Sequence, residues 1–395
     1  DASQVMGGTV LDPLDRLQGH FALMRHPAPR KALFLGLGTG ATLAAAAGHQ
    51  QIEAEGVEQL GEVIALLPAF PETTEDLFRA GRRIEITQAD PRLRIRTGTE
   101  RYDVILADIH HPAREGVGML YTVEHFEAIR QRLDDDGLFV QWLPLHQLDL
   151  PTLKLIIRSF MEVFPDARLS MGNLDPTTPV LALEGWVQKR PPRLSDLIDR
   201  TISSELAREL GEIGLDTPFA LFGGFLAGPV ALADFAGEGP LNTDDHPRVV
   251  FEAARSVYAP LDPAIDRLLT LVRSFAPKAV DALNFVGTPD PIGLAVRFER
   301  YWQARNAFLG LSTRIGVTGD PAVDARQLAP VLVQIVAQSP DFTPAYLPAV
   351  AIARAVAPSD PVLATQILSD LVQLAPEQAE AGVVLRELQA RQQGQ

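Results

Sequence analysis

Acidic side chains at the ends of predicted strands are the first residues of this sequence that could do chemistry. Tyr102-Asp-Val-Ile-Leu-Ala-Asp108 has the pattern of a buried strand that ends in a carboxylate, and open α/β sheets bind their ligands at that edge. A carboxylate there, beside the reactive carbon of a bound cofactor, could take a proton from an attacking amine. Asp108 is therefore the predicted catalytic base; the alternative is an N-cap for the segment that follows.

Three glycines that follow an apolar run predict a cofactor-binding loop. Gly36, Gly38 and Gly40 precede an alanine-rich stretch, so the backbone could approach a ligand closely and a helix N-terminus could offer N–H donors. A purely structural tight turn is the alternative. The spacing G-x-G-x-x-G ends at Ala41 or Leu43, depending on its start, so it does not separate dinucleotides from adenosine-type cofactors.

Two further carboxylates end predicted strands after this loop. Glu58 follows the run 52–57, about 20 residues after the glycines, where an acidic side chain can accept both hydrogen bonds of a ribose diol; a solvated strand-end glutamate is the alternative. Asp90 ends the next apolar run and could accept a hydrogen bond from the exocyclic amine of adenine. Its alternative is a helix cap or turn former, because Asp-Pro is common in turns.

The histidines do not predict a metal site. His110 and His111 are adjacent and His125 is nearby, but adjacent histidines on an extended turn point in different directions, and no carboxylate or cysteine pattern completes a tetrahedral site. We expect no metal. Four other histidines are predicted to be ordinary loop or surface residues: His26, His49, His146 and His246.

Alternating strands and helices must position these side chains. The apolar runs at 32–35, 52–57, 84–87, 104–107 and 138–141 are typical of strands, and the stretches between them, such as 41–48, 59–67 and 123–133, are typical of helices. This alternation predicts an α/β protein with a parallel, doubly wound, Rossmann-like sheet.

The chain is predicted to contain three regions. Residues 1–30 form a lead-in, 31–256 the α/β domain and 257–395 an all-α region, with helices expected at 262–275, 291–309, 323–338, 344–357, 361–374 and 377–391. Pro340 and Pro376 each lie between two of these helices, 36 residues apart, close to the roughly 34-residue period of tetratricopeptide repeats. A plain helical bundle fits equally well.

Composition limits the partners and the location. Asp and Glu outnumber Lys and Arg by 50 to 35, which disfavours nucleic acid. The absence of cysteine excludes disulfides and thiolate catalysis. No run approaches the roughly 18 apolar residues that span a membrane. We expect a cytoplasmic location, with a membrane tether only if a segment upstream of Asp1 was removed.

In their order along the chain, these motifs resemble the spermidine synthase family of polyamine aminopropyltransferases, and especially the soluble half of its bacterial fused forms. The resemblance covers about residues 1–256. It rests on His20 with His26, the loop Leu35-Gly-Leu-Gly-Thr-Gly40, Val57-Glu58, Ala89-Asp90, the strand ending in Asp108, Leu120-Tyr-Thr-Val-Glu-His-Phe126, Asp136-Gly-Leu-Phe-Val-Gln141 and Asn242-Thr-Asp-Asp-His-Pro247.

The resemblance implies a class I methyltransferase-like fold and a defined reaction. An amine or polyamine nitrogen would attack the aminopropyl carbon of decarboxylated S-adenosylmethionine and displace methylthioadenosine. Glu58 would hold the ribose, Asp90 the adenine and the glycine loop the methylthioadenosine end, while Asp108 would activate the amine. Substrate-binding roles would fall to five further residues: Gln4, His20, His111, Tyr121 and Gln141.

Several departures from the family pattern disfavour putrescine as the substrate. The family usually has Asp-x-x-Asp-Pro where this chain has Asp108-Ile-His-His111-Pro112, and an imidazole holds an ammonium group poorly. Leu14 and Asp15 stand where a tyrosine-histidine pair is expected, Thr39 replaces an aspartate of the loop, and the N-terminal hairpin domain is largely absent.

Two other functions compete with aminopropyl transfer. A methyltransferase could use the same scaffold with S-adenosylmethionine itself, because Asp108 would suit either reaction. A non-catalytic module could keep the α/β domain as a relic and bind a protein partner through its helical tail. A homodimer is a further expectation.

Overall fold

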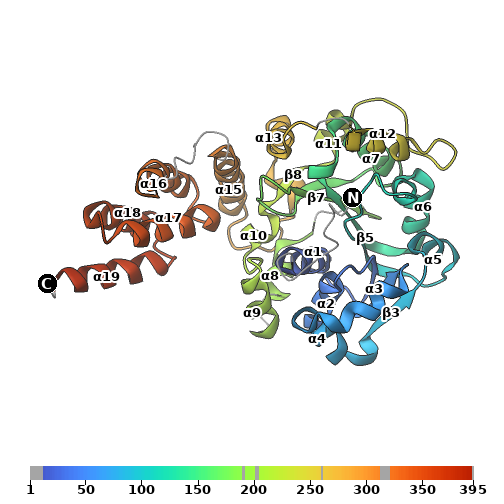
Figure 1. The fold of residues 1–395 in the computed structure, drawn as a ribbon, viewed down its shortest axis with the longest axis horizontal. Helices are drawn as coiled ribbons and strands as arrows, with labels where there is room; N and C mark the ends of the chain where they lie inside the picture. Colours follow the sequence, from blue (N-terminus) through green and yellow to red (C-terminus); the bar gives the residue numbers. More distant parts are fainter. Residues whose placement is uncertain (1–11, 189–191, 201–203, 259–260, 312–320, 394–395) are drawn as a thin grey trace. The chain divides into compact units, whose positions relative to one another are not determined.

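A computed structural model describes residues 12–188, 192–200, 204–258, 261–311 and 321–393 (Figure 1). The chain divides into two compact units, Asp1–Pro289 and Asp290–Gln395.

The first unit is built on one sheet with the strand order β3-β2-β1-β4-β5-β7-β6-β8. Its strands are β1 (Lys31–Leu35), β2 (Glu53–Glu58), β3 (Ile84–Gln88), β4 (Tyr102–Ala107), β5 (Leu133–Pro144), β6 (Arg168–Met171), β7 (Val180–Trp186) and β8 (Phe225–Ala227). The first five pair in parallel, and the predicted Rossmann-like sheet is confirmed. The last three add antiparallel pairs, which the sequence analysis did not predict.

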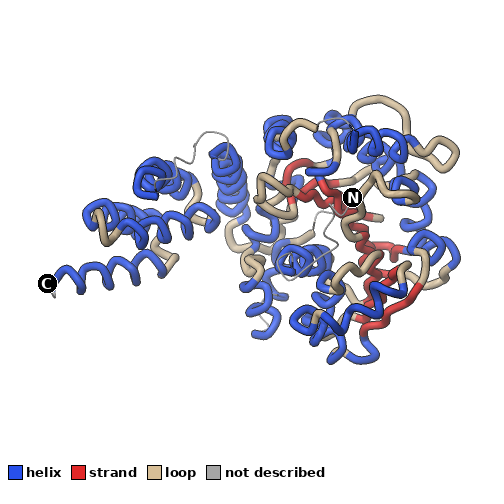
Figure 2. The backbone as a smooth tube through the Cα atoms, in the orientation of Figure 1, coloured by secondary structure: helices blue, strands red, loops and turns tan. Residues whose placement is uncertain are grey.

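Helices cover both faces of the parallel strands, and this explains why β1 and β4 are apolar along almost their whole length. One layer contains α1 (Asp12–Arg25), α2 (Ala41–Ala44) with its 3-10 extension η1 (Ala45–Gly48), and α4 (Pro71–Arg79). The other contains α5 (Pro91–Thr97), α6 (Val123–Arg132) and α7 (Leu150–Val163), packed in that order. Figure 2 shows the strands enclosed between helices.

Further helices and 3-10 turns complete the first unit. They are α3 (Gly61–Leu66), η2 (Leu67–Ala69), η3 (Gly81–Arg83), η4 (Val117–Tyr121), η5 (Leu145–Gln147), α8 (Leu194–Arg200), α9 (Ser204–Glu212), α10 (Pro218–Gly223), α11 (Pro229–Ala236), α12 (Arg248–Tyr258), α13 (Ala264–Ser274) and α14 (Ala279–Ala282). None of the helices in the described part of the chain is both long and apolar enough to cross a membrane.

The predicted domain boundary after residue 256 differs from the observed one after Pro289. The side chain of Arg267, on α13, donates hydrogen bonds to the carbonyls of Leu145 and His146 just after β5. Asn284 joins the segment before α8 through a backbone hydrogen bond to the carbonyl of Pro192. These contacts attach α13 and α14 to the α/β unit, although their sequence resembles that of the helical tail.

The second unit consists, in its described part, of five helices that pack in chain order. They are α15 (Pro291–Leu311), α16 (Pro321–Gln338), α17 (Thr343–Val356), α18 (Pro361–Leu374) and α19 (Glu380–Gln393). Each helix contacts the next, and α16 also contacts α18, as α17 does α19. The predicted helical character is confirmed. Stacked helix pairs of this kind are typical of repeat proteins, but the tetratricopeptide-like assignment stays a prediction.

A partly buried carboxylate ties α5 to the sheet of the first unit. Glu55, on β2, accepts hydrogen bonds from Arg94 (Nε, 2.9 Å; Nη2, 2.7 Å), from Tyr102 Oη at 2.7 Å and from Thr87 Oγ1 at 3.0 Å. Burial by itself would raise the pKa of Glu55, but the hydrogen bonds from Arg94 and Tyr102 outweigh it and lower the pKa below its usual value. The ionised carboxylate therefore stabilises the folded state.

Replacement of Glu55 by Gln should lower the free energy of unfolding at neutral pH by about 1–3 kcal/mol, because charged hydrogen bonds are lost in a site that solvent still partly reaches. Since folding lowers the pKa of Glu55, this contribution is present above the unfolded-state pKa of about 4.3 and is lost as the pH falls below it. Urea unfolding of wild type and E55Q at neutral and acidic pH measures the difference.

Glu75→Gln is the matched control. Glu75 pairs with Arg79 on the exposed face of α4, where an ion pair contributes less than about 1 kcal/mol. Equal destabilisation by the two substitutions, or a loss in E55Q that persists unchanged in acid, would contradict the role given to Glu55.

Candidate functional site

The carboxyl ends of β1, β2 and β4 bring three of the predicted site residues together. Leu35 at the end of β1 pairs with Val57 of β2 on one side and Ala107 of β4 on the other. The residues that follow these three are Gly36, Glu58 and Asp108. Two backbone hydrogen bonds continue the pairing: Gly36 N donates to the Val57 carbonyl at 2.9 Å, and Asp108 N donates to the Leu35 carbonyl at 3.0 Å. The strand order reverses between β1 and β4. Open α/β sheets bind ligands at such a switch point.

The predicted glycine loop has a backbone that only glycine adopts readily. Gly36, Gly38 and Gly40 have φ values of 97°, 51° and 87°, in the left-handed region. A Cβ atom on Gly36 would lie 3.1 Å from the ring of His110 and 3.3 Å from Cβ of Asp108. Gly36 is therefore needed for its conformation and for the close approach of the turn that follows β4.

Glu58 fastens the glycine loop to the end of β2. Its largely buried carboxylate accepts a hydrogen bond from Leu37 N at 3.2 Å with one oxygen and from Leu60 N at 2.9 Å with the other. A carboxylate has about four lone-pair positions, so each oxygen keeps capacity to accept from a ribose hydroxyl. The position predicted for a ribose-binding residue is compatible with this geometry.

Asp90 is the N-cap of α5, which is the alternative that the sequence analysis left open. One of its oxygens accepts a hydrogen bond from Leu93 N at 2.9 Å. The residue is exposed, and its other oxygen has no partner among the described residues. Ala89 N donates to the carbonyl of Glu58, so the cap lies beside Glu58 on the neighbouring strand end. The adenine role is compatible with capping, because it would use the second oxygen.

Asp108 has the surroundings of a general base. Its carboxylate accepts a hydrogen bond from Ile109 N at 2.7 Å and a longer one from Thr42 Oγ1 at 3.4 Å. Burial raises the pKa of Asp108, and the charge of Glu58 adds to this effect, while His110 and the hydrogen bonds oppose it. A raised pKa makes a carboxylate a stronger base at neutral pH. Asp108 caps no helix, because the next helical element, η4, begins at Val117.

The turn after Asp108 places two imidazoles and a tyrosine at this edge. Nδ1 of His110 lies 2.7 Å from the carbonyl of Asp108 and is therefore the donor. Nδ1 of His111 accepts from Ala113 N at 3.2 Å. The buried hydroxyl of Tyr121 donates to the His110 carbonyl at 3.2 Å. Burial raises the pKa of Tyr121, so this residue remains a donor and positions the turn.

Gln141 lies one strand away from this group. It pairs with Ala107 in the register of β4 and β5. The side chain is buried, its amide nitrogen donates to the Trp142 carbonyl at 3.1 Å, and its Oε1 has no partner among the described residues. A buried amide oxygen without a partner is costly unless a ligand or water satisfies it, which is compatible with the predicted substrate-binding role.

The structure does not bring His20 to the Asp108 edge. His20 Nδ1 lies 3.1 Å from Nε2 of His49, and His20 Nε2 lies 3.1 Å from the carboxylate of Glu209. His49 follows η1 and shortly precedes β2, so this cluster sits at the amino-terminal edge of the parallel strands, opposite to Asp108. His49 lies in a loop, which is one of the two predicted alternatives, and it is buried. Gln4 lies outside the described residues.

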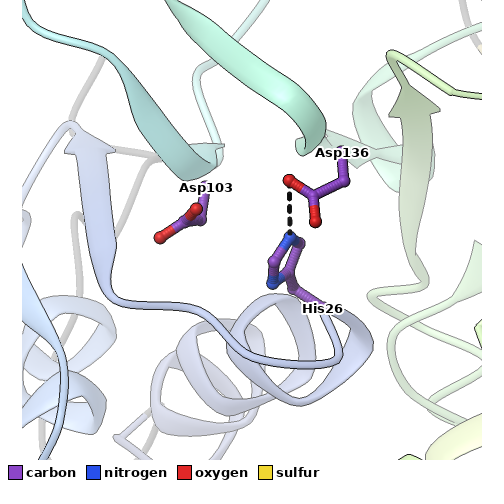
Figure 3. A group of neighbouring side chains, drawn as sticks. All are labelled: His26, Asp103 and Asp136. Atoms are coloured by element: carbon purple, nitrogen blue, oxygen red, sulfur yellow. Dashed lines mark ion pairs between the residues drawn. The ribbon is translucent and has the colours of Figure 1, made fainter.

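A second cluster at the amino-terminal edge has potential metal ligands, but its hydrogen bonds do not suit a metal. His26, Asp103 and Asp136 have ligand atoms within 4.8 Å of one another (Figure 3). Nδ1 of His26 accepts from Ala28 N at 3.3 Å, whereas a histidine that ligates through Nε2 carries its proton on Nδ1. Asp103 accepts from the backbone N–H groups at the start of β1. The cluster therefore fixes the entry to β1. His26 lies in the loop after α1, which is one of the two predicted alternatives, and it is buried.

Sequence reasoning missed an ion pair that supports the site from a distance. Arg92, in the first turn of α5, forms two hydrogen bonds with the carboxylate of Asp244 and donates to the Met119 carbonyl. Asn242, in the same loop as Asp244, donates to the Gly118 carbonyl at 3.2 Å. Together they hold η4, which carries Tyr121. The motif Asn242-Thr-Asp-Asp was visible in the sequence, but its partners were not.

A surface cavity of about 780 Å³ lies away from these residues. It is formed by α7, α11 and α13, and no predicted site residue lines it. Its two cationic side chains already have partners: Lys154 lies over the ring of Phe235, and Arg158 donates to the carbonyls of Ala236 and Pro240. The cavity therefore does not define the functional site.

Comparison with known proteins identifies the α/β part of the chain. Residues 14–182 match the spermine/spermidine synthase domain. The polyamine aminopropyltransferase of Thermotoga maritima is 31% identical over 154 residues, which cover 39% of this chain and 52% of that protein. The enzyme of the same name from Moorella thermoacetica is 32% identical over 162 residues, covering 40% and 56%. The crystal structure of spermidine synthase from Thermotoga maritima aligns with 25% identity and a TM-score of 0.40, covering 47% of this chain and 62% of that one.

The sheet order defines a Rossmann-like fold of the methyltransferase type, and the glycine loop and the acidic strand ends lie at the carboxyl edge, where such folds bind their ligands. The matched residues contain Gly36, Glu58, Asp90 and Asp108. These matches lie within the α/β part of the chain, and the resemblance to the spermidine synthase family inferred from the motifs is confirmed. The chain spans about half the length of these two curated relatives.

Gly36→Ala should destabilise the protein more than Gly116→Ala. Both glycines have a positive φ, so each substitution carries backbone strain of roughly 1–2 kcal/mol. Only Gly36 faces a ring and a carboxylate-bearing carbon, whereas a Cβ at Gly116 meets nothing within 4 Å. The close contact should add about 1–3 kcal/mol for Gly36→Ala, measured by urea unfolding.

A second measurement tests whether the His110 ring causes the extra cost of Gly36→Ala. In a His110→Ala background the ring is gone, so the excess cost of Gly36→Ala over Gly116→Ala should fall markedly. An excess that is unchanged without the His110 ring would show that this ring does not pack over the glycine loop.

Proposed function

We propose that this protein moves an aminopropyl group from decarboxylated S-adenosylmethionine to an amine and releases methylthioadenosine. The observation that carries the proposal is the position of Asp108, a carboxylate with a raised pKa that directly follows β4 and adjoins Gly36 of the glycine loop. The match of residues 14–182 to the spermine/spermidine synthase domain supports aminopropyl transfer as the reaction class.

The residues around Asp108 fit an adenosyl group. The N-terminal end of α2 follows the glycine loop, Glu58 keeps lone pairs beside it, and Asp90 has an oxygen without a partner in the described part of the chain. We assign the ribose hydroxyls to Glu58, the adenine amine to Asp90 and the sulfur-bearing end to the glycine loop. This order places the sulfonium group at the Asp108 end, where its positive charge is stabilised by a carboxylate.

The proposed reaction is a single displacement. The lone pair of the acceptor nitrogen forms a bond to the aminopropyl carbon next to sulfur while the carbon–sulfur bond breaks, and sulfur keeps the electron pair as the neutral thioether of methylthioadenosine. The nitrogen loses one proton, which the Asp108 carboxylate accepts. Burial raises the pKa of Asp108, so the carboxylate is a stronger proton acceptor than an exposed aspartate.

Asp108→Asn should lower the rate of methylthioadenosine release by about 10²- to 10⁴-fold, the usual contribution of a general base. In the wild type, kcat/KM should rise with pH as Asp108 loses its proton, with a midpoint above the ordinary aspartate pKa of about 3.9. This rise of kcat/KM with pH should be absent in D108N. Product release is followed by chromatography with a panel of amines.

Asp103→Asn is the matched control on the same strand. Asp103 accepts backbone hydrogen bonds at the amino-terminal end of β4, so its loss should reduce stability and leave kcat of the folded protein within about a factor of three of wild type. Equal rates for D108N and wild type would refute Asp108 as the base.

Binding measurements separate aminopropyl transfer from its competitors. Calorimetry should show tighter binding of decarboxylated S-adenosylmethionine than of S-adenosylmethionine; the reverse order would favour a methyltransferase. Methylthioadenosine should raise the melting temperature by mass action. A protein that responds to none of the three ligands is a relic, and the proposal fails.

A further inference from the structure

The two oxygens of the Asp108 carboxylate accept unequal hydrogen bonds. Oδ1 accepts from Ile109 N at 2.7 Å, a short bond from the next residue in the chain. Oδ2 accepts from the hydroxyl of Thr42 at 3.4 Å, a long bond from a different element, α2. A bond of this length is weak, and it leaves Oδ2 with lone-pair capacity for a proton. Of the two oxygens, Oδ2 is therefore the better proton acceptor.

Thr42 lies in a closely packed part of the first unit. It is the second residue of α2, whose four residues are all buried, and it is itself 1% exposed. Helix α1 packs directly against it, because a Cβ on Gly19 would lie 2.2 Å from the Thr42 carbonyl oxygen and 2.7 Å from Cβ of Ala45. Only a glycine at position 19 allows this approach. The backbone that carries the Thr42 hydroxyl is therefore held in place by α1.

The Thr42 hydroxyl is directed at the predicted base. Threonines inside a helix often donate to a carbonyl of the preceding helical turn, but Thr42 stands in the first turn of α2. Within the described part of the chain, the hydrogen bond of its hydroxyl goes to Asp108. A buried hydroxyl needs a partner, and here that partner is the carboxylate that follows β4.

Several groups act on the protonation of Asp108. Burial has the largest effect and raises its pKa, and the charge of Glu58 adds to this; His110 and the hydrogen bonds from Ile109 N and Thr42 lower it. A hydrogen bond that favours the ionised form makes a carboxylate a weaker base. A short bond from Thr42 would therefore reduce the basicity that burial provides, whereas the long bond orients Oδ2 with little loss of basicity.

We infer that Thr42 is a positioning residue for the base: its hydroxyl holds Oδ2 of Asp108 in the orientation in which this oxygen accepts the proton of the attacking amine. This inference rests on the proposed function. Thr42 takes no part in the displacement itself, because the proton moves from the nitrogen to Oδ2 and the hydroxyl keeps its own proton.

Thr42→Val removes the hydroxyl and keeps the shape of the side chain. The ionised form of Asp108 then loses one hydrogen bond, so its pKa should rise, and the increase of kcat/KM with pH should have its midpoint at a higher pH than in the wild type. Below that midpoint, kcat/KM for methylthioadenosine release should fall by about three- to tenfold, as the loss of one modest hydrogen bond predicts. Thr42→Ser restores a hydroxyl and should return both values nearly to those of the wild type.

Thr152→Val is the matched control. Thr152 is also a buried threonine in the first turn of a helix, α7, where its backbone N–H donates to the N-cap Asp149. T152V should leave the midpoint of the pH profile unchanged. A midpoint in T42V equal to that of the wild type, even with a loss of stability, overturns the inference, and so does a T42S variant that behaves like T42V. If T42V does not fold, Thr42→Ala takes its place in the same comparison.

A direct titration separates the inference from the function on which it rests. Infrared spectra recorded over a range of pH follow the protonation of Asp108 without substrate, and the band is assigned by its absence in D108N. If no amine yields methylthioadenosine but the infrared midpoint is higher in T42V than in the wild type and T42S, aminopropyl transfer fails while Thr42 remains the group that orients Asp108. Equal infrared midpoints in T42V and the wild type overturn the inference whatever the rates are.

Discussion

The parallel register of three strand ends is the constraint on which the candidate site depends. Leu35 pairs with both Val57 and Ala107, so the residues that come next in the chain must emerge side by side at one edge. The glycine loop can then turn over the end of β4 because Gly36 has no Cβ to collide with the turn. A shift of one residue in any of these pairings would send the carboxylates to different faces of the sheet.

Burial shifts the pKa values of the acidic and the basic side chains at this edge in opposite directions. Removing solvent disfavours any charged form, so the pKa of Asp108 rises while the pKa values of His111 and His146 fall. The edge thus combines a carboxylate able to accept a proton with imidazoles that remain neutral.

Contacts between distant parts of the chain hold η4, the 3-10 turn that carries Tyr121, in place beside the candidate site. Asp244 reaches back to Arg92, and Asn242 reaches back to Gly118, so a loop after α11 positions the 3-10 turn that carries Tyr121. Tyr121 in turn bonds the carbonyl of His110. The family match ends at residue 182, before this loop, yet the loop supports residues inside the matched region.

The sequence by itself determined the parallel strands, the glycine loop, the acidic strand ends and the helices of the tail, because each depends on a local pattern of apolar, small and charged residues. Only the tertiary structure decided that β6 to β8 run antiparallel, that α13 and α14 belong to the first unit, that His20 lies at the far edge and that Thr42 and His110 are the neighbours of Asp108. These features depend on contacts between residues far apart in the chain and on burial, which no local pattern specifies.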